Sequence, residues 1–332
     1  MMALPLGSRT ASTLLILVAL ASTACGDKED PPDDTQPETD TDTTAGVDPA
    51  TVPLAGPCTM AGDYGGFVVD ALAEYSTVSG SISDGVVPMT VLEEVAVEGD
   101  CRALRRNNPY CNPPCESDQA CDFDNSCVPY PATQDLGTVS ILGLGDDVEM
   151  SPVSPGYTYF DTSVGHPAYE AGQLVQLKTQ GGPWGPLTLY GVGVQQIELE
   201  QDTWLLYEGQ DLTITWPPPE GQVRSHVFLR VTIDQHGATP ISLSCTFDDD
   251  GEGVIPGTMT DLLVAAGVTG FPNGSLVRRT ADSVNLGDAG CMDFVVSSSR
   301  MPDVRVDGFT SCDDDEDCPE GQECNEALEI CE

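Results

Sequence analysis

Cysteine carries the clearest chemistry in this sequence, because 13 cysteines occur among 332 residues. Eight of them form two groups of four, which are Cys111, Cys115, Cys121 and Cys127, then Cys312, Cys318, Cys324 and Cys331. Neither group contains the C-x2-C pair that zinc sites favour. Few apolar residues lie between these cysteines, so a hydrophobic core cannot hold the segments together. We therefore predict two small cysteine-rich modules, each held by disulfide bonds.

Spacing does not settle the pairing inside a module, since four cysteines allow three connectivities. Our working hypothesis links first to third and second to fourth, which gives Cys111–Cys121, Cys115–Cys127, Cys312–Cys324 and Cys318–Cys331. Cys58 and Cys101 stand at the two ends of a stretch with short strand signals. A bond between them would staple a small sheet that cannot build much core alone.

The best candidate for a cation site is the acidic turn at residues 248–252, where Asp248, Asp249, Asp250 and Glu252 surround Gly251. Calcium prefers several oxygen ligands, and a turn of this kind can supply them. The turn lacks the D-x-D-x-D-G spacing of an EF-hand loop, so we favour a plain acidic hairpin turn. Weak calcium binding stays open as the alternative, and no other cofactor is indicated.

Catalytic motifs are absent from the sequence. His166, His226 and His236 have no metal-style partner two to four residues away, and no G-x-S-x-G or H-E-x-x-H motif occurs. A Ser–His–Asp site assembled from distant strands stays open, because triads are defined by geometry. So does a glycan hydrolase with carboxylates beside Trp184 or Trp204, whereas we expect Trp216 in the core. Our prediction is that the protein is not an enzyme.

The elements that position these residues are mostly strands. Val227, Leu229, Val231 and Ile233 share one face of a strand, opposite His226, Phe228, Arg230 and Thr232. One apolar and one polar face per strand is typical of an antiparallel sandwich. Only Met259–Ala266 has helical character, and Asn273–Ser275 reads as a hairpin turn. We predict an all-β fold, with an antiparallel β-sandwich as main domain and small disulfide-stapled cysteine-rich modules.

The first residues indicate export. Arg9 precedes an apolar run of about 11 residues, which ends in small residues just before Cys25. A run of this length is too short to cross a bilayer as a helix. This order resembles a bacterial lipoprotein signal, and the resemblance implies that Cys25 carries lipid, although Ser22 stands where Leu is commonest. Ordinary cleavage after Ala24 is the alternative. Lipid on Cys25 would leave 13 − 1 = 12 cysteines, which can all pair.

Together these patterns divide the chain into five regions. They are a signal peptide at 1–24, a disordered acidic tether at 25–52, a small β region with a four-cysteine module at 53–130, the β-sandwich at 131–306, and an acidic four-cysteine module at 307–332. The tether contains too little apolar surface to offset the entropy of ordering.

Charge narrows the choice of partners. The chain has 54 acidic and 12 basic residues, a formal charge of −42. Such a chain repels phosphate backbones, so we expect no nucleic acid partner. It also repels anionic headgroups, which leaves the acyl chains on Cys25 as the expected membrane contact.

Two family resemblances complete this reading of the sequence. Asp211–Pro219 resembles the early Trp-bearing strand of fibronectin type III and immunoglobulin-like sandwiches, a resemblance that implies an intersheet Cys245–Cys291 bond. The whole layout resembles uncharacterised cysteine-rich lipoproteins of myxobacteria. We expect this chain to be an exported lipoprotein of the outer membrane or cell surface. We expect a role in binding, adhesion or envelope structure, with a protein or glycan ligand. The alternatives are a secreted glycan or peptide hydrolase and a calcium-stabilised surface module.

Overall fold

The computed structural model describes residues 46–221, 224–237, 240–287 and 290–332. The signal peptide, Cys25 and most of the predicted tether therefore lie outside the described residues. Residues 46–332 belong to one compact unit. Among the described residues, no helix has the length and hydrophobicity that a membrane crossing needs.

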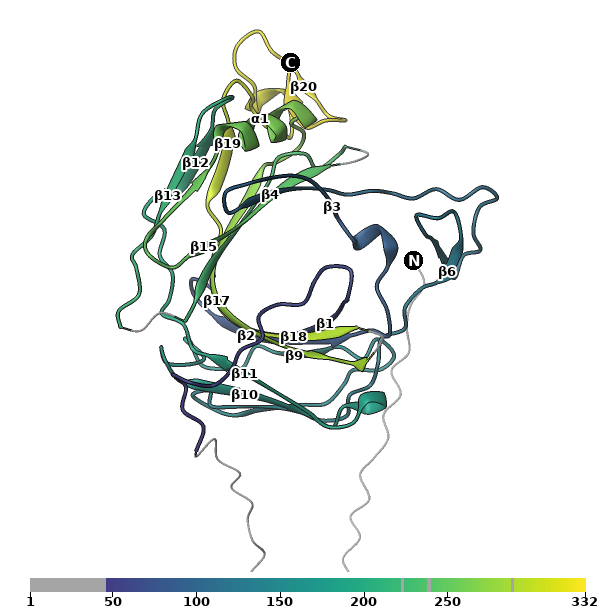
Figure 1. Ribbon diagram of the computed structural model, residues 1–332. Coiled ribbons are helices and arrows are strands. Elements are labelled where there is room, and N and C mark those ends of the chain that lie inside the picture. The colour runs from purple at the N-terminus through teal and green to yellow at the C-terminus, as the bar shows by residue number, and fades with distance from the viewer. Residues whose placement is uncertain (1–45, 222–223, 238–239, 288–289) are drawn as a thin grey trace, which may run out of the picture. The chain divides into compact units, whose positions relative to one another are not determined.

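One large sheet organises this unit, and it curves strongly along its width (Figure 1). Its strands in spatial order are β3 (Glu93–Glu98), β4 (Cys101–Arg105), β15 (Ile241–Asp248), β14 (His226–Thr232), β17 (Asn273–Asn285), β18 (Cys291–Arg300), β1 (Asp63–Ala71), β2 (Ser76–Ile82) and β9 (Tyr159–Asp161). Two further strands, β12 (Thr203–Leu206) and β19 (Asp303–Val306), pair with each other, and β19 also contacts β17.

A second sheet packs on one half of the large sheet. It contains β11 (Leu187–Val192), β10 (Leu174–Thr179), β7 (Val139–Leu142) and β8 (Val148–Met150), in that order. Phe67 and Phe294 of the large sheet and Ile141, Leu177 and Leu189 of the second sheet are all fully buried in one cluster. Two sheets that bury their apolar faces against each other form a β-sandwich, so the predicted all-β fold is confirmed.

The other half of the large sheet has a separate core. It is covered by β12, by the pair β13 (Leu212–Thr215) and β16 (Glu252–Ile255), and by α1 (Gly257–Ala266). Trp204, Trp216 and Leu263 pack there against Leu229 and Leu243. The predicted helix and the buried position of Trp216 are both confirmed. Trp204 is buried as well, so it is not available to stack on a sugar ring.

Both cores lie against the same face of the large sheet. Along β17 the buried positions alternate, so Leu276, Arg278 and Thr280 point to the cores while Val277 and Arg279 point the other way. Leu276 belongs to the second core, and Thr280 bonds to the backbone of Val192 in the second sheet. The opposite face of the large sheet is therefore left for other contacts.

The cysteine-rich modules are small hairpins. The first contains β5 (Gln119–Cys121) and β6 (Cys127–Pro129), and the second contains β20 (Cys324–Asn325) and β21 (Ile330–Cys331). Their bonds are Cys111–Cys121, Cys115–Cys127, Cys312–Cys324 and Cys318–Cys331, which is the order that we hypothesised. Short 3-10 turns lie at Pro88–Thr90, Gly182–Trp184 and Asp315–Asp317.

The two remaining disulfides differ from our prediction. The structure pairs Cys58 with Cys291 and Cys101 with Cys245, so the expected Cys58–Cys101 and Cys245–Cys291 bonds are wrong. Cys101 and Cys245 face each other across the neighbouring strands β4 and β15, which makes this bond a link within one sheet rather than between sheets. The prediction failed because it assumed that cysteines pair within their own stretch of sequence.

The same interleaving brings strands from two of the predicted regions into one sheet. Strands β1 to β4, from the region 53–130, share the large sheet with β14, β15, β17 and β18, from the region 131–306. Two pairs, β1 with β18 and β12 with β19, are parallel, so the sheet is not purely antiparallel. Asn273–Ser275 begins β17 and is not a hairpin turn. Parallel neighbours need long connections, which short-range turn signals cannot reveal.

The end of the predicted tether is part of the folded unit. Residues 46–62, which we call the N-terminal strap, hold Val52 in a small apolar cluster with Leu174 and Val192. The backbone N–H of Ala55 donates to Asp282 at 2.9 Å, and that of Cys58 donates to Asp293 at 2.7 Å. The Cys58–Cys291 bond then ties the strap to β18.

Candidate binding surface

The face of the large sheet that points away from both cores is the candidate functional surface, and we call it the inner face. Residues directly opposite each other on paired strands project to the same side, so register identifies the members of this face. They include Val68, Asp70, Arg102, Phe228, Arg230, Ser244, Thr246, Val277, Arg279, Ala281, Asp293, Val295 and Ser299. Most are half-buried or exposed, and small, hydroxylated and charged side chains predominate.

Arginines cluster on this surface although the chain as a whole is strongly acidic. Arg102, Ser244, Arg230 and Ser275 form one row across β4, β15, β14 and β17. Arg279 lies two rows away, opposite His226, and its guanidinium carbon is 4.3 Å from the ring centre of Phe228, which is in the row between them. A cation stacked over an aromatic face in this way gains electrostatic attraction and also holds the ring in place.

Sequence reasoning did not single out these arginines as functional. The alternation in β14 did place Phe228 and Arg230 on the polar side of the strand, but it could not show that Arg102 and Arg279 come from strands beside it. The one usable signal was scarcity, because only 12 residues of the chain are basic. Where basic residues are rare, several on one surface are informative.

Charged groups on the inner face modify each other's protonation. Burial lowers the pKa of Arg279, and the negative charge of Asp293 opposes that lowering. Burial raises the pKa of Asp293 to about 6, with further increases from Asp63 and Asp282, while the hydrogen bond from Cys58 and the charge of Arg279 act in the opposite direction. The usual value for Asp is about 3.9.

This shift predicts a pH-dependent loss of stability. Because the folded protein holds the Asp293 proton up to about pH 6 and an unfolded chain releases it near pH 4, this residue destabilises the fold as pH rises between those values. Asp293→Asn should therefore raise the melting temperature at pH 7 and leave it nearly unchanged at pH 4. Thermal unfolding at both pH values measures the difference. The exposed Asp202→Asn is the control, and an equal gain at pH 4 and pH 7 would contradict the assignment to Asp293.

One of the four candidate calcium ligands in the acidic turn, Asp249, is not available to a cation. Asp249 is buried and forms a two-bond ion pair with Arg278, with Nε–Oδ2 at 2.7 Å and Nη2–Oδ1 at 2.9 Å. Trp216 Nε1 donates to the same carboxylate at 3.0 Å. Asp248, Asp250 and Glu252 line a pocket of about 430 Å³ together with Asp100.

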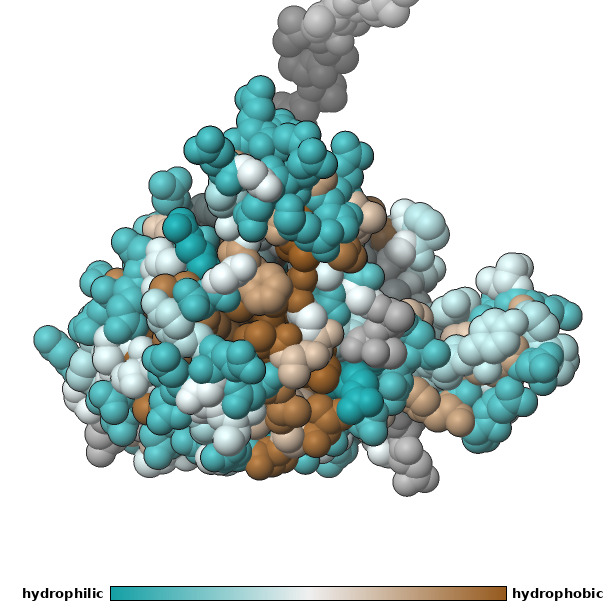
Figure 2. Space-filling view, turned by 90° about the horizontal axis from the view of Figure 1, so that it is seen from above, coloured by the Kyte–Doolittle hydropathy of each residue, from teal (hydrophilic) through white to brown (hydrophobic). Residues whose placement is uncertain are grey.

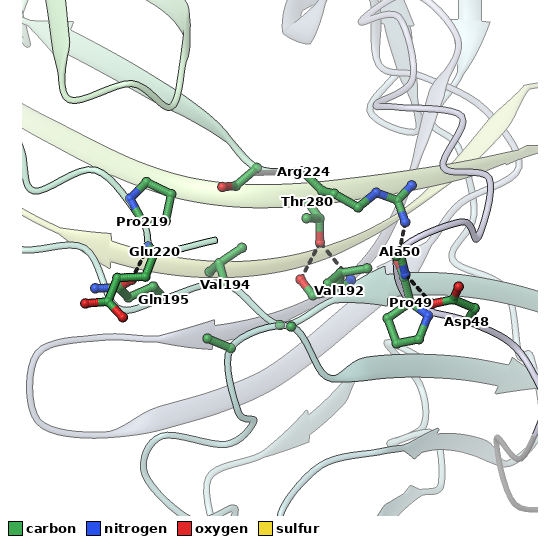
Figure 3. A pocket seen from close by; sticks show the side chains of 14 residues that line it. Asp48, Pro49, Ala50, Val192, Val194, Gln195, Pro219, Glu220, Arg224 and Thr280 are labelled. Atoms are coloured by element: carbon green, nitrogen blue, oxygen red, sulfur yellow. Dashed lines mark hydrogen bonds between the residues drawn. The ribbon is translucent and has the colours of Figure 1, made fainter. Parts of the chain in front are cut away.

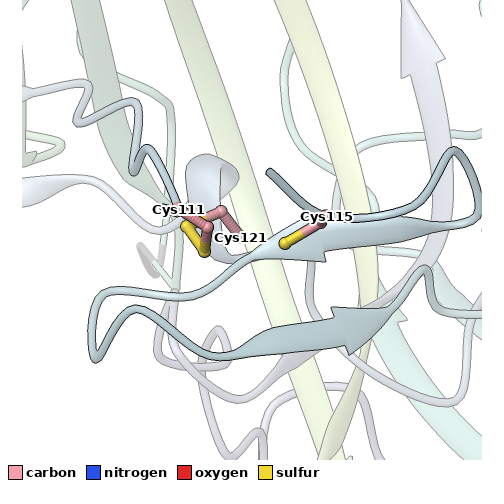
Figure 4. A group of neighbouring side chains, drawn as sticks. All are labelled: Cys111, Cys115 and Cys121. Atoms are coloured by element: carbon pink, nitrogen blue, oxygen red, sulfur yellow. A yellow bond between two sulfur atoms is a disulfide. The ribbon is translucent and has the colours of Figure 1, made fainter. Parts of the chain in front are cut away.

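The remaining acidic side chains of this turn do not converge on one point. Within the part of the chain that the structure describes, three groups of potential ligands come within 4.8 Å of each other, and the acidic turn is not among them. One such group is Cys111, Cys115 and Cys121, shown in Figure 4, where Cys111 and Cys121 are joined in a disulfide. Disulfide sulfurs are not thiolates, so these cysteines are not metal ligands in this oxidised form.

None of the three histidines lies in an assembled triad among the described residues. Ser76 Oγ lies 3.0 Å from His166 Nδ1, but Ser76 is fully buried and also accepts the backbone N–H of Ala168. His236 pairs with Glu329 of the C-terminal module at 3.0 Å. That contact, with the hydrogen bond from Gly270 N to Leu328 O, fastens the module to the sheet.

His226 sits on the inner face beside an acid but not beside a nucleophile. Its Nδ1 lies 3.7 Å from Asp248, and both side chains are well exposed. Ser297 is in the same row but two strands away, which is about 10 Å. Its hydroxyl donates to Asp70 at 2.9 Å, and Arg279 lies between it and His226. This row is an arrangement of charges and hydroxyls suited to holding a ligand.

Two of the larger pockets among the described residues lie outside the inner face. Figure 3 shows the first, of about 400 Å³, where Arg224 points to the strap and Thr280 points to Val192. Arg224 donates to the carbonyl oxygens of Pro49 and Val52, so its charge is engaged in holding the strap. The second pocket, of about 440 Å³, lies beside β19 and includes Phe271 and Phe309.

The surface seen from above is largely hydrophilic, with hydrophobic residues gathered in a strip across the middle of the view (Figure 2). Trp184, the other aromatic residue proposed for sugar stacking, packs partly buried against the first core. Neither Trp184 nor Trp204 is therefore exposed for stacking on a sugar. On the inner face, the aromatic residue that contacts a cation is Phe228.

Comparisons with known proteins return only distant likenesses. No protein-family model matches the sequence, and no curated protein matches it. Among solved structures, the chain is similar to the FN1–FN3 domains of chicken CNTN1, with 8% identity over 66% of each chain and a TM-score of 0.18. It is also similar to a Ca²⁺-stabilized adhesin that helps an Antarctic bacterium bind ice, with 12% identity over 74% of this chain and 72% of that one, and a TM-score of 0.18.

Proposed function

We propose that this is an exported, lipid-anchored protein of the outer membrane or cell surface, whose inner face binds an extracellular ligand. The observation that carries the proposal is the group of arginines, with Phe228, on one face of a sheet in a chain of charge −42. Arginine and aromatic residues are both enriched at binding interfaces. The role is adhesion or binding and not turnover.

The covalent architecture suits a protein that works outside the cell. Six disulfides join the described cysteines, and such bonds persist in oxidising compartments. The signal-like run before Cys25 supports the anchor, for which more than one acyl chain is needed, at about 0.8 kcal/mol for each buried CH₂. A surface protein held in this way meets its ligand at the membrane.

The test combines anchoring and binding in one series of full-length variants. In a high-salt wash, which screens ionic contacts of the inner face, Cys25→Ser should move the protein from the membrane fraction to the soluble fraction. At low salt the released protein should be retained when it is added back to isolated cell envelopes, and adding Arg230→Glu should reduce that retention at least tenfold because it reverses a charge on the inner face. Arg305→Glu is the matched control, since Arg305 is exposed on β19 beside Asp303.

Each arm can fail separately. If Cys25→Ser stays in the membrane fraction after the high-salt wash, the anchor lies elsewhere. If Arg230→Glu and Arg305→Glu weaken retention equally, overall charge decides binding and the inner face does not. A correctly folded Arg230→Glu variant is verified by an unchanged melting temperature, because Arg230 is exposed.

A further inference from the structure

Two arginines at one end of the large sheet line the same pocket, and neither has an acidic partner. Arg224 and Arg300 also lack one, but they donate to backbone carbonyl oxygens, and Arg279 stacks on Phe228. Arg102 pairs with Glu94, Arg278 with Asp249 and Arg305 with Asp303. In contrast, Arg106 and Arg230 have no carboxylate within ion-pair distance anywhere in the described ranges. With 54 acidic residues available, unpaired arginines side by side indicate a place kept for an external anion.

The two arginines line a common pocket of about 220 Å³. Arg230 is on β14, and Arg106 follows β4, where its backbone N–H donates to Pro240 at 3.0 Å. Pockets for drug-sized ligands have volumes of about 300–1,000 Å³. A smaller pocket suits a single ring-sized group presented by a larger molecule.

The other polar residues of the pocket define the chemistry of that group. Thr232 and Ser242 contribute hydroxyls, and Gln235 contributes an amide. Asp234 also lines the pocket, but one of its oxygens accepts the backbone N–H of Gly237 at 2.7 Å and the hydroxyl of Thr269 at 2.6 Å. Two arginines and one aspartate leave one net positive charge, which matches one carboxylate.

We propose that this pocket binds a uronic acid residue of an extracellular glycan. A guanidinium presents paired N–H donors that match the two oxygens of a carboxylate. The ring that bears the carboxylate of a uronic acid also carries hydroxyl groups, and Thr232, Ser242 and Gln235 are partners of the right kind for them. An acidic peptide side chain has a carboxylate without such hydroxyls. The inference rests on the proposed function and identifies the class of ligand.

The experiment uses the soluble Cys25→Ser protein and D-glucuronate as the probe, with binding followed by calorimetry and saturation-transfer NMR. D-glucuronate should bind, and glucose and the glucuronate methyl ester should bind at least tenfold more weakly. Arg106→Gln and Arg230→Gln should each weaken glucuronate binding at least tenfold. Arg305→Gln, which removes a paired arginine far along the chain, should leave it unchanged.

Three results would overturn the proposal. They are no detectable glucuronate binding, equal binding of glucuronate and tri-glutamate, and equal loss in Arg305→Gln and Arg230→Gln. Retention on cell envelopes by the same protein separates this inference from the proposed function. If glucuronate fails while retention stays sensitive to Arg230→Glu, the inner face binds a ligand of another class and only the uronate proposal falls.

Discussion

Replacing Asp249 with alanine should lower the free energy of unfolding by about 3–5 kcal/mol, the range for breaking a buried ion pair by removing one partner. Asp249 and Arg278 are both almost fully buried, with side-chain exposures of 0% and 1%. The substitution leaves the charge of Arg278 without a carboxylate inside the fold and leaves Trp216 Nε1 without its acceptor.

The position of this pair explains why so much depends on it. Arg278 also donates to the carbonyl oxygen of Pro217 at 2.6 Å and to those of Gln195 and Gln196 at 3.3 Å. It therefore joins β17 to the segments that leave β11 and β13, which belong to different cores. The Asp249–Arg278 ion pair therefore links the two halves of the fold through buried hydrogen bonds.

The neighbouring acid gives a matched control. Asp250 is exposed, so Asp250→Ala should change the free energy of unfolding by no more than about 0.5 kcal/mol. Chemical denaturation of both variants measures the contrast. Combining Asp249→Asn with Arg278→Met should cost less than the sum of the two single substitutions, because each alone leaves an unpaired partner. Similar losses for Asp249→Ala and Asp250→Ala would refute the structural role of the pair.

The acidic turn also shows how far sequence reasoning could go. From composition alone, four residues were equivalent candidates for ligands of a cation, namely Asp248, Asp249, Asp250 and Glu252. Alternation along β15 places Phe247 in the core and Asp248 outside it, so the next residue returns to the core side. The sequence thus held a signal that Asp249 is buried, but its partner Arg278 lies 29 residues away and could not be identified.

Local patterns predicted the strands, the helix α1 and the core position of Trp216, since each depends on neighbours in sequence. The inner face depends instead on which strands become neighbours in space. Phe228 stacks under Arg279 because β14 pairs with β17, and Arg102 joins Arg230 through β15. No period of two or of 3.6 residues encodes that order, so the surface was invisible until the strand order was known.

The Cys58–Cys291 disulfide is the longest-range covalent link between described residues, and it too depends on strand order. Replacing both Cys58 and Cys291 with serine should lower the free energy of unfolding by about 4–5 kcal/mol. The residues are 233 apart in sequence, but the Cys101–Cys245 bond shortens the loop. The closed path runs from 58 to 101 and from 245 to 291, which is 43 + 46 = 89 residues. A loop of about 100 residues gives about 4.7 kcal/mol by chain entropy.

A disulfide within the C-terminal module provides the contrast. Cys318 and Cys331 are 13 residues apart, and their bond constrains only the module. Replacing both with serine should leave the main unfolding transition of the sandwich in place, while Cys58→Ser with Cys291→Ser should shift it to lower denaturant. Denaturation followed by tryptophan fluorescence separates the two, because Trp204 and Trp216 lie in the second core. Equal shifts in both variants would mean that the module and the sandwich unfold as one unit, and no shift in the Cys58 and Cys291 variant would mean that the strap adds nothing to global stability.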